Sequence, residues 1–141
     1  VTVQPWEELR DLRQAWVEVL RGMAAAGILE AQLRLALASP RGRATALRVL
    51  RDGSAQQVMD LVDDVFTTAV TPSADTGLAR TVLARLDPGW LALTLRGLLA
   101  ERLDAGSVSA EEQRCIVDLL TELDQPALLA EVTPRHAHRP R

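Results

Sequence analysis

Apolar residues recur at steps of three and four along most of the chain, a spacing that predicts amphipathic α-helices. The longest stripe follows Pro5, which suits the first turn of a helix, and stops before Gly27, which favours a helix end. It consists of Leu9, Leu12, Trp16, Val19, Leu20 and Met23. Because Trp16 belongs to this stripe, we expect it in the core.

Glycine, proline and capping patterns divide the remaining chain into about seven shorter helices. One of them follows Ser54 and carries Val58 through Val65 as a continuous helix. The segment 89–103 is the most apolar, so we expect it in the most buried position. The other predicted helices cover 28–38 and 41–51, Leu78 to Leu86, Ser109 to Leu123, and Pro126 to about Val132. Short turns make neighbouring helices antiparallel, and the predicted fold class is all-α.

A leucine-rich segment ending in aspartate occurs three times. The copies are Leu47-x-x-Leu50-x-Asp52, Leu83-x-x-Leu86-Asp87 and Leu120-x-x-Leu123-Asp124. The matched leucines lie 36 and then 37 residues apart, a period typical of stacked helical hairpins. The sequence therefore predicts a single helical domain over 1–132, with cap helices in 1–39, three hairpins in 40–132 and a flexible basic tail in 133–141.

This unit resembles the HEAT-like class of α-solenoid repeats over roughly Arg41 to Val132. The stretch Leu86-Asp87-Pro88 looks most like the turn between that family's helices, and Leu50 to Gly53 and Leu123 to Pro126 look like degenerate versions of it. The resemblance implies a protein-binding scaffold in which aligned second helices form the surface for another chain. An irregular helical bundle explains the same apolar pattern, so both architectures stay open.

A shorter stretch, from Asp104 to Glu112, is similar to the turn and helix of TerB-like tellurite-resistance domains. That similarity implies an acidic, metal-responsive domain in which Asp60, Asp63, Asp64 or Glu112 would bind a divalent cation. The stretch does not fit an EF-hand loop that begins at Asp104, because its third and fifth positions, Gly106 and Val108, lack side-chain oxygens. A helix cap at Ser109 explains the same residues without a metal.

The composition supports helices, since tyrosine is absent and phenylalanine occurs once. The formal net charge of −3 favours neither nucleic acid nor an anionic membrane as a partner. All 16 basic residues are arginine, which a GC-rich genome or avoidance of lysine modification would explain. The N-terminal residues lack the pattern of a signal peptide, and Cys115 is the only cysteine. We expect a cytoplasmic protein.

Catalytic chemistry finds little support in the sequence. The only histidines, His136 and His138, fall in the predicted tail, where a general base would lack a rigid support. Cys115 adjoins an apolar position of a helix and is more typical of a core or boundary residue than of a nucleophile. We therefore expect no enzyme activity, no catalytic residue, no resident metal and no cofactor.

A contrast of charge is the main indication of a binding surface. The predicted third helix carries Arg41, Arg43, Arg48 and Arg51, and the next helix carries Asp60, Asp63 and Asp64. We interpret these residues, together with Trp90 in the first turn of its helix, as a surface that orients a partner protein. A solvated charged face is the plainer alternative. An obligate homodimer that shares the apolar helix 89–103 is another.

Overall fold

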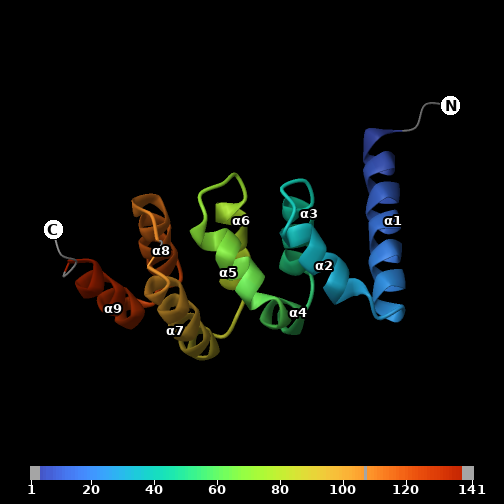
Figure 1. Cartoon of the computed structure of the whole chain (residues 1–141). Helices are drawn as coiled ribbons and strands as arrows, with labels where there is room; N and C mark the ends of the chain where they lie inside the picture. Colours follow the sequence, from blue (N-terminus) through green and yellow to red (C-terminus); the bar gives the residue numbers. More distant parts are fainter. Residues whose placement is uncertain (1–3, 107, 138–141) are drawn as a thin grey trace. The chain divides into compact units, whose positions relative to one another are not determined.

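The chain folds entirely into helices in the part that the computed structural model describes, residues 4–106 and 108–137. Nine helices and no strand occur there, which confirms the predicted all-α class. The chain divides into two compact units, Val1–Leu33 and Arg34–Arg141, which we call unit 1 and unit 2. Figure 1 labels the helices of both.

Unit 1 consists of α1 (Pro5–Ala25) and the first part of α2 (Leu29–Leu37). Pro5 occupies the first helical position, the Glu7 carboxylate accepts a hydrogen bond from the Gln4 backbone N–H at 3.4 Å, and Gly27 turns the chain with φ 72°. No residue of α1 is buried, and Trp16 is 38% exposed. The prediction that Trp16 lies in a core is therefore wrong. The spacing of apolar residues predicted the helix α1 and its apolar face. It could not predict whether another part of the protein packs against that face.

The helix predicted after Ser54 is two helices in the structure, α4 (Ala55–Asp60) and α5 (Val62–Val70). The chain bends at Leu61, with φ −115° and ψ 16°. Val58 before the bend and Val65 after it are both fully buried. The apolar spacing continues through the bend, which is why the sequence predicted one helix.

The core of unit 2 centres on α5, which buries Val62, Val65, Phe66, Thr68, Ala69 and Val70. This helix packs against α6 (Thr76–Leu83) and α8 (Ala110–Glu122). The segment predicted as most buried, now α7 (Pro88–Asp104), buries only Leu91, Leu95 and Leu99 and leaves Leu93 72% exposed. That prediction was wrong because the leucines of α7 surround the helix, so only one face of it can be covered.

The three leucine-rich repeats fall on α3 (Arg43–Asp52), α6 and α8, and hydrogen bonds join the turns that follow these helices. Arg85 donates from Nη1 to the Leu50 carbonyl at 2.5 Å and from Nη2 to the Gly53 carbonyl at 2.6 Å. Gln125 Nε2 donates to the Pro88 carbonyl at 3.2 Å. Successive turns of the repeat therefore lie in contact, and Figure 1 shows α3, α6 and α8 following one another along unit 2.

The aspartates of the three turns differ in local geometry. Asp52 is the last residue of α3, whereas Asp87 caps α7 by accepting a hydrogen bond from the Trp90 N–H at 3.0 Å. Asp124 has a positive φ of 52°. The last helix, α9 (Pro126–Ala137), extends five residues beyond the predicted end at Val132, so the first part of the predicted tail is helical. Residues 138–141, with His138, lie outside the described residues.

Candidate partner-binding surface

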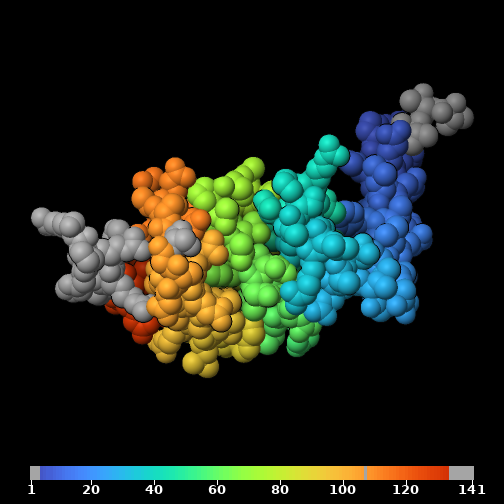
Figure 2. Space-filling view, viewed as in Figure 1, coloured from blue at the N-terminus to red at the C-terminus, as the bar shows by residue number. Residues whose placement is uncertain are grey.

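A surface cavity of about 370 Å³ lies within unit 2, between α5, α7 and the start of α8. Its apolar lining comes from Phe66, Leu98, Ala105 and Val108, of which Phe66 and Val108 are buried. Its polar lining comes from Asp63, Thr67, Glu101, Arg102 and Glu112. In the space-filling view of Figure 2, the green surface of α5 and α6 adjoins the orange surface of α8, consistent with the packing of α5 on both helices.

Helix ends hold the polar residues of this cavity in place. The Ser109 hydroxyl accepts a hydrogen bond from the Glu112 backbone N–H at 3.1 Å and so begins α8 with Glu112 in its first turn. The Glu112 carboxylate in turn lies 3.3 Å from Arg102 Nη2, near the end of α7. Both side chains are half-buried, and the Arg102 Nε has no hydrogen-bond partner. The sequence pattern that predicted a cap at Ser109 thus also positions one side of the cavity.

The charges around the cavity are unbalanced. Three carboxylates (Asp63, Glu101 and Glu112) and one guanidinium (Arg102) give a formal charge of −2. Glu101 is exposed and takes part in no ion pair with the side chains of residues 4–106 and 108–133. An apolar floor beneath an acidic rim suits a side chain that combines an aliphatic stem with a cationic end. The described residues that line the cavity include no histidine, cysteine or serine, so they provide no pairing of a nucleophile with a base.

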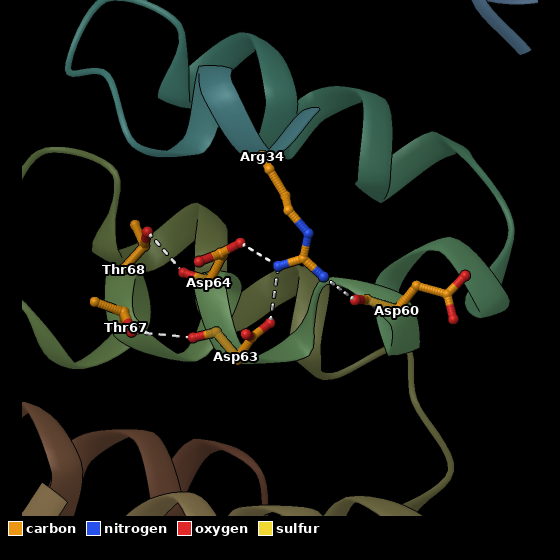
Figure 3. A network of polar contacts seen from close by, with 6 residues as sticks. All are labelled: Arg34, Asp60, Asp63, Asp64, Thr67 and Thr68. Carbon is orange, nitrogen blue, oxygen red and sulfur yellow. Dashed lines mark hydrogen bonds and ion pairs between the residues drawn. The ribbon is translucent and has the colours of Figure 1, made fainter. Parts of the chain in front are cut away.

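A single arginine organises the aspartates beside the cavity (Figure 3). Arg34, the first residue of unit 2, donates to the Asp64 carboxylate at 2.8 Å, approaches the Asp63 carboxylate at 3.5 Å, and donates to the Asp60 backbone carbonyl at 2.9 Å. The hydroxyls of Thr67 and Thr68 donate to the Asp63 and Asp64 carbonyls one turn back along α5. Arg34 therefore offsets part of the negative charge at the start of α5.

The predicted surface residues do not form one group. Arg43 donates from Nε to the Leu37 carbonyl at 3.1 Å, and Arg51 pairs with the adjacent Asp52 at 3.2 Å. Arg41 and Arg48 are exposed. Within the described residues, no ion pair joins these four arginines to Asp60, Asp63 or Asp64, and Arg34 of α2 pairs with the last two instead.

Only Asp63 of the predicted surface residues lines the cavity. The Asp60 carboxylate accepts a hydrogen bond from Gln56 Nε2 at 2.8 Å. Trp90 is half-buried in the first turn of α7 and is not among the lining residues. Sequence reasoning missed Arg34, Phe66, Glu101 and Arg102. None of them shows a local signal, because tertiary packing alone brings these helices together.

The acidic residues that the TerB-like similarity implies as ligands of a divalent cation do not form a cluster. Across 4–106 and 108–133, no three histidine, cysteine, aspartate or glutamate side chains lie close enough together to hold an ion. Two of the candidates, Asp63 and Asp64, instead share Arg34, and Glu112 pairs with Arg102.

Comparison of the chain with protein-family models, curated proteins and solved structures found no significant match. In the described part of the chain, every helix is too short or too polar to span a lipid bilayer.

Proposed function

We propose that this chain is a noncatalytic protein-interaction module, an adaptor or regulator in the cytoplasm, that binds a partner protein through one face of its stacked helical hairpins. The observation that carries the proposal is the cavity between α5, α7 and α8, with its apolar floor and acidic rim. A concave site of this volume accommodates one or two side chains of a partner rather than a flat surface.

The position of the cavity in the repeat supports this proposal. The helices α5 and α7 follow the first and second turns of the repeat, so they correspond to second helices of its hairpins. In HEAT-like repeats, which the sequence resembles, aligned second helices form the surface for another chain. A shared orientation of α5 and α7 toward one cavity agrees with that use.

The chemistry of the cavity points to a basic segment of the partner. An arginine or lysine could place its methylene groups against Phe66 and Leu98 while its charge approaches Glu101. Because Arg34 and Arg102 already pair with Asp63 and Glu112, Glu101 is the carboxylate most available to an incoming cation. Negative potential around the cavity would also speed the encounter with a basic partner.

Selection from a display library of random peptides tests this proposal. Peptides recovered on the intact protein are expected to carry a common arginine or lysine, and Glu101→Gln is expected to weaken their binding about threefold to tenfold. The matched control is Asp118→Asn, which removes the same charge from an exposed position of α8 outside the cavity and should leave binding unchanged. Peptides without a basic residue, or equal binding to all three proteins, would refute the proposal.

A further inference from the structure

The apolar stripe of α1 is exposed over most of its length. Leu9, Leu12 and Val19 are 68%, 67% and 61% exposed, and no residue of α1 is buried. A contiguous exposed stripe of large apolar side chains marks an interaction surface, whereas single exposed leucines do not.

The spacing of this stripe specifies the kind of partner that fits it. Leu9, Leu12, Trp16, Val19 and Met23 follow one another at steps of three, four, three and four residues. This is the seven-residue repeat of a coiled-coil seam, with Leu9, Trp16 and Met23 at a positions and Leu12 and Val19 at d positions. A helix with such a seam packs against another helix with the same seam.

We infer that α1 pairs with α1 of a second copy of this chain as a parallel two-stranded coiled coil. The charges beside the seam support this orientation. In a parallel pair, Glu8 at a g position faces Arg13 at the following e position of the other copy, and the contact occurs twice by symmetry. An antiparallel pair would bring g positions together and set Glu8 against Ala15 or Gly22, neither of which is charged.

The remaining polar contacts of α1 leave the seam free. Arg10 pairs with Asp11 at 3.3 Å and lies 5.6 Å from the centre of the Trp6 ring, and both charged residues occupy outer positions of the heptad. Glu8 and Arg13 take part in no ion pair within the described residues, so both are available to a second copy.

Charge and area also favour a second copy over a lipid surface. The helix carries four acidic residues and three arginines, a balance that gives no attraction to an anionic membrane. Its exposed apolar side chains offer on the order of 500 Å² per copy, so a pair reaches the roughly 1,000 Å² of a small specific interface. We therefore expect a weak dimer with a Kd of roughly micromolar order.

Sedimentation equilibrium of the intact chain over a wide range of concentration measures this association. The wild-type mass should rise from that of one copy towards that of two, and Leu12→Glu should remain monomeric because it buries a charge in the seam. Gln14→Glu is the matched control, since it adds the same charge at the outer f position and should dimerise as the wild type does. A wild-type chain that stays monomeric at every concentration would overturn the inference.

Charge reversal tests the orientation. Glu8→Arg and Arg13→Glu should each weaken the dimer about threefold to tenfold, and the double variant should restore wild-type association. In a Cys115→Ser background, Leu12→Cys should form an interchain disulfide on oxidation, whereas Gln14→Cys should not. Failure of the double variant to recover, or of Leu12→Cys to cross-link, would overturn the parallel arrangement. No residue of α1 lines the cavity of unit 2, so these outcomes are distinct from those that test peptide binding.

Discussion

Arg85 shows how one side chain can tie two turns of the repeat together. It follows α6, yet both ends of its guanidinium donate to carbonyls at the end of α3, those of Leu50 and Gly53. Carbonyls at a helix C-terminus lack partners within the helix and carry partial negative charge, so a cation there satisfies both needs. Arg80 has a similar role between α6 and α8, where it donates to the Cys115 carbonyl and pairs with Glu122.

We expect Arg85→Met to lower the free energy of unfolding by about 1–3 kcal/mol, because it keeps the aliphatic stem but removes two charge-assisted hydrogen bonds. Arg114→Met is the control, since Arg114 is exposed on α8 and no ion pair of the described residues involves it. Urea denaturation of both variants measures the difference. A loss for Arg85→Met no larger than that for Arg114→Met would show that the bonds between turns add nothing to stability.

Some residues of the site could be predicted from the sequence and others could not. Asp63 was predicted as a surface residue and lines the cavity, and the cap formed by Ser109 was predicted and positions Glu112. Arg34, by contrast, is separated from Asp64 by 30 residues, and no periodicity connects them. Such a pairing follows from how α2 meets α5, which local patterns do not encode.

At the level of helices, the spacing of apolar residues predicted where helices form better than it predicted which helices are buried. The helix starts predicted at Pro5, Ser54 and Ser109 agree with the structure, because caps and first-turn prolines act locally. The bend at Leu61 was missed because a stripe can run through a change of helix axis. The sequence predicted α7 as the most buried helix, whereas α5 has that position. This was missed because the hydrophobic content of a helix does not indicate which helix packs between two others.

Two leucines of α7 provide a direct test of this distinction. Leu95 is fully buried, whereas Leu93, two residues earlier, is mostly exposed. We expect Leu95→Ala to cost about 2–5 kcal/mol of unfolding free energy and Leu93→Ala less than about 0.5 kcal/mol. Thermal or chemical denaturation distinguishes the two. Equal losses at the two positions would contradict the packing of α7 described above.

In the whole molecule, the two compact units carry different surfaces. Unit 2 has a buried core and the cavity with an acidic rim, while α1 in unit 1 exposes an apolar seam. We propose that the cavity of unit 2 binds a basic segment of another protein and that the seam of α1 joins two copies of the chain. A dimer joined through α1 would contain two copies of the cavity, one in each chain.

The most direct measurement is a double-mutant cycle between Glu101 and the basic residue of a selected peptide. Calorimetry would compare the peptide and its citrulline analogue, which is neutral but has nearly the same shape as arginine, on the wild-type chain and on Glu101→Gln. We expect a coupling free energy of about 0.5–2 kcal/mol, with the loss caused by citrulline largely absent in the variant. Equal losses on both proteins would mean that the cation does not meet Glu101, and would contradict binding in this cavity.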